Sequence, residues 1–126
     1  MILAVVDDLL FLSKIRQTAK LLGIVVESAQ PGDLPQLVIE NVPTGLIIDL
    51  NHRSGKALEV LRTLKSDLKT KGIAVIGFVS HVQSDLIAAA RDAGCDLVLP
   101  RSAFVSQLPS LLQRFSGTDT AGRAAE

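Results

Sequence analysis

Short apolar runs alternate along the chain with longer stretches in which apolar residues recur every three or four positions. Runs of this length, bounded by glycine, proline and polar residues, are typical of strands that are buried on both faces of a sheet. They predict five strands, at residues 2–6, 24–26, 44–48, 73–79 and 96–99.

The longer stretches predict helices with one apolar face. The first should stop at Gly23, a natural helix end, and the second should be a short helix at about 33–40. In the third, the lysines and arginines, Lys65 among them, are expected to form a solvated face. The apolar stripes of the first and third helices are formed by Leu12, Ile15, Ala19 and Leu22, and by Ala57, Leu61, Leu64 and Leu68.

Two further helices complete the pattern. Ser84 is the expected N-cap of the fourth, and the fifth should begin near Ser106, because Pro109 is tolerated only in a first helical turn. Five strands alternating with five helices predict an α/β fold, a doubly wound five-stranded parallel sheet with right-handed crossovers. We expect one domain at 1–115 and a disordered tail at 116–126, which is small and polar.

The composition of the chain argues against several classes of function. The 126 residues suffice for one core, and 13 basic residues balance 13 acidic ones, which gives no support to nucleic-acid or anionic-membrane binding. No apolar run approaches the ~18 residues of a membrane span, and the N-terminus does not resemble a signal peptide. Cys95 cannot form an internal disulfide and should pack as a small apolar residue. These features predict a cytoplasmic protein.

Three carboxylates stand where predicted strands end. Asp7 and Asp8 follow the first apolar run, and Asp49 ends the third. Parallel strands present their carboxyl ends at one edge of the sheet, where open α/β sheets bind ligands. Carboxylates gathered there would repel one another, and a hard divalent cation such as Mg²⁺ would relieve the repulsion. An aspartate beside such an ion is also a nucleophile towards phosphorus.

Asp7 and Asp8 after the first strand, Asp49 at the end of the third, and five strand–helix units together make the chain resemble the receiver domain of two-component response regulators. The segments LEVLRTLK (58–65) and ARDAGCDLVLP (90–100) are also similar to receiver segments. The resemblance covers residues 1 to about 115 and implies a flavodoxin-like (CheY-like) fold with strand order 2-1-3-4-5.

The resemblance also implies roles for single residues. Asp49 matches the aspartate that accepts a phosphoryl group from a histidine kinase or a histidine phosphotransfer protein and then loses it by slow hydrolysis. Asp7 and Asp8 match the acidic pair that holds Mg²⁺ (or Mn²⁺), together with Asp49 and the main-chain carbonyl of Asn51. The surface of the fourth helix, fifth strand and fifth helix would bind a downstream protein or a second copy of the chain.

Four positions depart from the receiver pattern. Val79 stands where receivers carry a hydroxyl at the end of the fourth strand, and Ser80 comes one residue late, on the opposite face of a strand. Arg101 falls where a lysine is expected and is the candidate phosphate counter-ion, although its planar guanidinium is not equivalent to an ammonium. Leu99, or alternatively Val98, occupies the place of the usual aromatic switch residue.

Two hypotheses follow. In the first, the chain is a working receiver. In the second, it is a degenerate receiver, a protein-interaction module that acts without phosphorylation. A flavin-binding domain is disfavoured by the scarcity of aromatic rings, and a metabolic phosphohydrolase by the lack of a clear second general acid or base.

Simpler roles remain open for single residues. Asp8 is also a possible N-cap of the first helix, and Arg101 a possible surface residue. His52 and His81 are expected to be solvated loop residues.

Overall fold

The computed structural model describes residues 1–81 and 83–117; residues 118–126, most of the expected disordered tail, lie outside this range. Five strands are present in this part of the chain: β1 (Ile2–Val5), β2 (Val26–Ser28), β3 (Gly45–Asp49), β4 (Ala74–Val79) and β5 (Leu97–Pro100). The helices are α1 (Leu9–Leu21), the 3₁₀ turn η1 (Pro31–Asp33), α2 (Gln36–Asn41), α3 (Ala57–Ser66), α4 (Ser84–Asp92), α5 (Arg101–Ser106) and α6 (Leu108–Phe115).

The strands form one parallel sheet in the order β2-β1-β3-β4-β5, which confirms the predicted fold and strand order. β3 lies at the centre, between β1 and β4. Its residues Leu46, Ile47 and Ile48 are all at most 1% exposed, as the apolar run predicts. Asp49 is the last residue of β3 and is paired with Phe78 of β4, so its carboxylate lies at the carboxyl end of the sheet.

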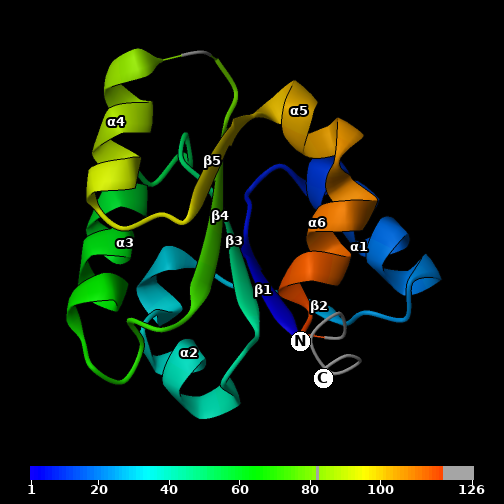
Figure 1. Ribbon diagram of the computed structural model, residues 1–126, viewed down its shortest axis with the longest axis horizontal. Helices are drawn as coiled ribbons and strands as arrows, with labels where there is room; N and C mark the ends of the chain where they lie inside the picture. The colour runs from blue at the N-terminus through cyan, green and yellow to red at the C-terminus, as the bar shows by residue number, and fades with distance from the viewer. Residues whose placement is uncertain (82, 118–126) are drawn as a thin grey trace.

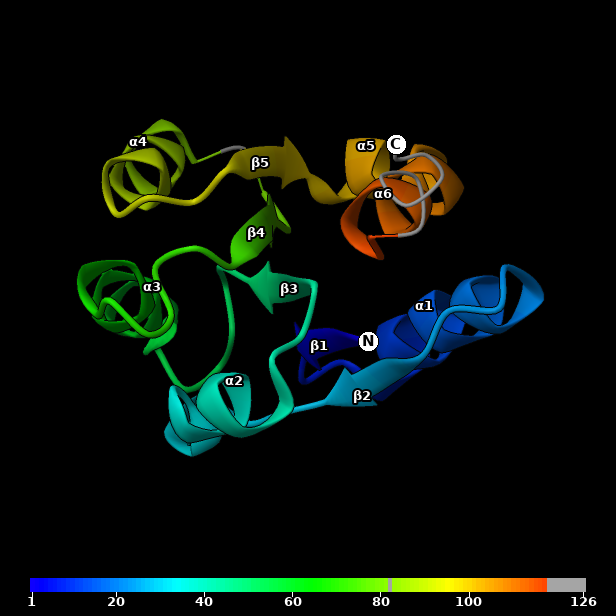
Figure 2. The same cartoon turned by 60° about the horizontal axis from the view of Figure 1, so that its bottom comes forward.

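Helices cover both faces of the sheet (Figures 1 and 2): α1, α5 and α6 lie on one side, and α2, α3 and α4 lie on the other. Alternate strand residues therefore point into two separate apolar cores. Ile47 and Ile76 pack towards α1 and α6, whereas Ile48 and Val75 pack towards α3. In the first core, the rings of Phe78 and Phe104 stack with centroids 5.1 Å apart.

Several predicted boundaries are wrong by a few residues. β2 begins at Val26, two residues later than expected, because it is a three-residue edge strand in which only Val26 is buried. α3 ends at Ser66, so Leu68 does not belong to its apolar stripe and is 83% exposed. α4 begins after Gln83, and no side chain caps it, so Ser84 is not its N-cap.

The chain beyond β5 forms two helices instead of the single one expected near Ser106. α5 begins at Arg101, directly after Pro100, and α6 follows it after Gln107, which ends the first helix and precedes the second. Pro109 lies in the first turn of α6. Because proline has no N–H to donate, it cannot continue the hydrogen bonding of α5, and a new helix begins.

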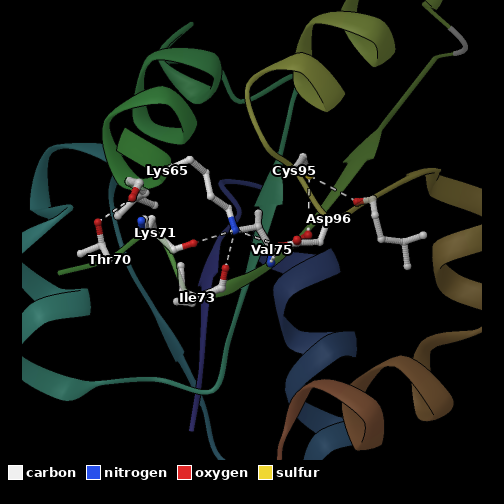
Figure 3. Close-up of polar contacts among 9 residues, drawn as sticks. Lys65, Thr70, Lys71, Ile73, Val75, Cys95 and Asp96 are labelled. Carbon is white, nitrogen blue, oxygen red and sulfur yellow. Dashed lines mark hydrogen bonds and ion pairs between the residues drawn. The ribbon is translucent and has the colours of Figure 1, made fainter. Parts of the chain in front are cut away.

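The lysine of α3 that was expected in solvent is largely buried. The side chain of Lys65 is 16% exposed, and its Nζ donates to the carbonyl of Ile73 at 2.6 Å and to Oδ2 of Asp96 at 3.0 Å (Figure 3). These contacts lie where β4 and β5 begin, at the end of the sheet opposite to Asp49.

In the described part of the chain, no helix is both long enough and apolar enough to cross a membrane.

Candidate functional site

Asp49 is a buried carboxylate at the end of the central strand. It is 5% exposed, and its Oδ1 accepts a hydrogen bond of 2.8 Å from the main-chain N–H of Asn51. Burial raises the pKa of Asp49, and the negative charge of Asp7 raises it further, while the bond from Asn51 opposes both effects. Asp7 and Asp49 are therefore close enough to repel each other.

Asp7 follows β1 and is held by the loop after β3. Its Oδ2 accepts the main-chain N–H of Arg53 at 3.0 Å and lies 3.3 Å from Nε of the same residue. The Arg53 side chain is 87% exposed, so this ion pair contributes little free energy. The main-chain bond nevertheless joins the loop after β3 to the end of β1.

Asp8 has two partners, one for each oxygen. Its Oδ1 caps α1 by accepting the N–H of Phe11 at 3.1 Å, so the N-cap role considered for it is confirmed. Its Oδ2 accepts Nη2 of Arg101 at 3.0 Å. The bond from Arg101 and, after it, the bond from Phe11 lower the pKa of Asp8.

Arg101 begins α5 and reaches back over the start of α1. Its guanidinium carbon lies 4.0 Å from the centroid of the Phe11 ring, the geometry of a cation–π contact. Its positive charge also lowers the pKa of Asp49, although less than burial raises it. Arg101 thus stands next to the acidic cluster rather than on a remote surface.

The hydroxyl expected at the end of β4 has no direct substitute. Val79 is fully buried in the core on the α3 side of the sheet. The main-chain N–H of Ser80 donates to Oδ1 of Asn51 at 2.8 Å, and Nδ2 of Asn51 donates to Oε1 of Gln83 at 2.7 Å. Leu99 pairs with Phe78 across β4 and β5 and packs, partly buried, against the first core.

The side chain of Asn51 was not identified from the sequence, where only its carbonyl was considered. Its two amide contacts join the loop after β3 to the loop after β4, as described for Ser80 and Gln83. The one available signal was its side-chain chemistry: an amide that follows a buried strand both donates and accepts hydrogen bonds.

His52 was expected in solvent, and this expectation is wrong. The residue is 7% exposed, and its Nδ1 accepts the main-chain N–H of Ser54 at 3.1 Å and lies 2.9 Å from the Ser54 hydroxyl. The compact turn after Asn51 folds the ring inward, which a polar loop sequence does not reveal. His81 is exposed, as expected.

The donor chemistry of the cluster suits a hard divalent cation, because every candidate ligand is a carboxylate or carbonyl oxygen. The mutual repulsion of Asp7 and Asp49 would be relieved by such an ion. However, within residues 1–81 and 83–117, no three His, Cys, Asp or Glu side chains are gathered into one ligand set. Asp7 and Asp8 are each paired with an arginine instead.

No family model matches this sequence, and no curated protein does. Solved structures match nearly the whole chain. The receiver domain of the DNA-binding response regulator merR from Colwellia psychrerythraea has a TM-score of 0.78 and 20% identity, over 90% of this chain and 94% of that one. The phosphorylated cyanobacterial phytochrome response regulator RcpA has a TM-score of 0.71 and 21% identity, over 99% and 94%.

The Mn²⁺-bound form of response regulator Rcp1 matches with a TM-score of 0.68 and 20% identity, over 99% of this chain and 95% of that one. Identities of this size show a common fold and leave the chemistry of the site to be argued from its residues. The chain has the fold of response regulator receiver domains.

Proposed function

We propose that this chain is a receiver module of two-component signalling, in which Asp49 accepts a phosphoryl group from a histidine kinase or a histidine phosphotransfer protein. The observation that carries the proposal is a buried carboxylate at the end of the central strand of a receiver fold, with Asp7 and Arg101 close enough to change its pKa. The functional unit is residues 1–115, and the proposed place of action is the cytoplasm.

In the proposed reaction, a carboxylate oxygen of Asp49 attacks the phosphorus of a phosphohistidine. The new O–P bond forms as the P–N bond breaks, and the bonding pair leaves with the imidazole, which takes up a proton. Mg²⁺ or Mn²⁺ would be held by Asp7, Asp8, Asp49 and the carbonyl of Asn51. When bound, the ion would neutralise charge on the phosphoryl oxygens. That the matching Rcp1 is named as Mn²⁺-bound and RcpA as phosphorylated supports both parts of the proposal.

Exposed apolar residues support a protein as the phosphoryl donor. Leu9 and Leu10, which begin α1 directly after Asp8, are 77% and 86% exposed. Two neighbouring leucines in water beside an acidic cluster suit a protein surface better than a small molecule. A downstream protein, or a second copy of the chain, would bind the surface of α4, β5 and α5.

The test uses a small phosphoryl donor. The chain is incubated with acetyl phosphate and Mg²⁺, and intact-protein mass spectrometry is expected to show one added phosphoryl group. Asp49→Asn should stay unmodified, whereas Asp92→Asn, at an exposed position of α4, should react like the parent. If the parent gains no mass, and beryllofluoride with Mg²⁺ leaves its NMR spectrum unchanged, the proposal fails.

A second candidate is a protein-interaction module that does not use phosphorylation. Val79 offers no hydroxyl to a phosphoryl group, and the Asn51 side chain already holds the N–H of Ser80 in the unmodified chain. Ser80, the first residue after β4, is thus held without a phosphoryl group. This candidate predicts that Asp49→Asn binds the downstream protein as tightly as the parent does, with or without acetyl phosphate.

A further inference from the structure

Asp8, a proposed metal ligand, already has both oxygens in use. Oδ1 accepts the N–H of Phe11 at 3.1 Å, and Oδ2 accepts Nη2 of Arg101 at 3.0 Å. A divalent cation needs an oxygen lone pair at about 2.1 Å, and it repels a guanidinium bound to the same carboxylate. An ion that binds Oδ2 of Asp8 therefore competes with Arg101 for this carboxylate.

Arg101 is held in place by more than the ion pair. Its guanidinium lies 4.0 Å above the ring of Phe11, the residue whose N–H also binds Asp8. The ring is itself fixed, with its centroid 5.0 Å from that of Phe78 and 5.8 Å from that of Phe104. Asp8, Phe11 and Arg101 thus form a closed unit in which one rigid ring positions the cation.

The ion pair between Asp7 and Arg53 is easier to break than the one between Asp8 and Arg101. Its side-chain partner, Arg53, is 87% exposed, whereas Arg101 is 35% exposed and covers an aromatic ring. Water replaces an exposed arginine at little cost. Of these two arginines, Arg101 is the one whose displacement costs more.

We propose that Arg101 and the divalent cation compete for Asp8, so that Arg101 lowers the metal affinity of the site and leaves Asp8 when the ion binds. The inference rests on the metal site of the proposed function. It adds a regulatory element that belongs to this chain: the counter-ion of Asp8 is supplied by the first residue of α5. Metal binding would free Arg101 to turn towards a phosphoryl group on Asp49.

The first test measures Mn²⁺ affinity by the electron paramagnetic resonance signal of the free ion, with the full chain and no phosphoryl donor. Arg101→Gln keeps much of the side-chain length and removes the charge. It is expected to bind Mn²⁺ about three- to tenfold more tightly than the parent, the range set by one partly exposed ion pair and one cation–π contact. Arg91→Gln, an exposed arginine of α4, is the matched control and should bind like the parent.

A second variant separates direct competition from a general effect of charge. Phe11→Leu removes the ring under Arg101 and leaves every charge in place, and its folding is checked by a thermal melt. Competition predicts tighter Mn²⁺ binding here too, by a smaller factor. In the parent, the Nε–H signal of Arg101 in NMR spectra should shift as diamagnetic Mg²⁺ is added, whereas that of Arg91 should not.

The outcomes distinguish the inference from the function on which it rests. If the parent binds Mn²⁺ and Arg101→Gln binds it no more tightly, competition is wrong while the metal site stands. If Arg101→Gln gains affinity but Phe11→Leu does not and the Arg101 signal stays fixed, only long-range charge acts, and the inference is again wrong. If neither the parent nor Arg101→Gln binds Mn²⁺, both the proposed metal site and the proposed competition are wrong.

Discussion

Asp49 carries a charge in a place that disfavours it. Burial and the charge of Asp7 raise its pKa above the usual 3.8, so the folded state holds the proton more tightly than the unfolded state. Between the usual and the raised pKa, stability must therefore fall as pH rises, and above the raised pKa the full cost remains. Each pKa unit corresponds to about 1.4 kcal/mol.

Asp49→Asn removes this cost and is expected to be more stable than the parent near neutral pH. The advantage should shrink as pH falls from the raised pKa to the usual aspartate pKa, and it should be lost below that, where Asp49 is protonated in both the folded and the unfolded parent. Urea unfolding at several pH values measures it. Asp92→Asn, on the exposed face of α4, should change the free energy of unfolding by less than about 0.5 kcal/mol. A variant Asp49→Asn that is less stable than the parent at every pH would contradict the argument.

Cys95 packs as the small apolar residue that was expected. It is 7% exposed in the core on the α3 side, and burial raises its pKa to about 11. Only a thiolate reacts rapidly with iodoacetamide. We expect no labelling of the folded chain near pH 8 and complete labelling in urea, measured by mass spectrometry. Rapid labelling without denaturant would mean that this part of the core opens easily.

Lys65 ties one helix to two strands. From α3, its Nζ donates to the carbonyl of Ile73, ahead of β4, and to Oδ2 of Asp96, ahead of β5; the same Oδ2 accepts the N–H of Val75 at 2.8 Å (Figure 3). Gly94 has a φ of +100° and passes so close that an added Cβ would lie 2.8 Å from Cγ of Lys65. The approach of backbone to this side chain requires glycine.

Lys65→Met should lower the free energy of unfolding by about 1–3 kcal/mol, because the carbonyl of Ile73 loses a charged donor and Asp96 loses its partner. Lys69→Met, at an exposed position after α3, is the control and should have little effect. Both are measured by urea unfolding. Equal stability of the two variants would show that the contacts of Lys65 add nothing to the fold.

The sequence predicts elements well where burial is strong and poorly where contacts are distant. The apolar run of β3 identified a central strand, because a strand buried on both faces needs such a run. β2 was misplaced because one buried residue, Val26, gives almost no pattern. Asp49 could be proposed from its place at a strand end. The bond from Arg101 to Asp8 could not, because it joins residues 93 positions apart.

At the scale of the whole molecule, the two ends of the sheet are held by separate sets of polar contacts. At the amino end, the side chain of Lys65, which is 16% exposed, binds two main-chain carbonyls and the carboxylate of Asp96. At the carboxyl end, Asn51, Arg53 and Arg101 connect loops through contacts that are exposed or partly exposed. Only the contacts at the carboxyl end involve Asp7, Asp8 and Asn51, so they are the ones that a ligand bound at the acidic cluster would exchange.

Hydrogen exchange with Mg²⁺ and beryllofluoride should therefore change at one end only. We expect altered protection in the loops after β1, β3 and β4 and in the first turn of α5, with unchanged protection at 73–75 and 96–97. The contacts of Lys65 at the amino end involve none of the proposed ligand-binding residues, so local opening there gains or loses no contact with the ligand. Asp49→Asn serves as the control and should show no change with beryllofluoride at either end. Equal changes at both ends would mean that the sheet responds as one rigid body, and that the carboxyl-end contacts do not confine the response.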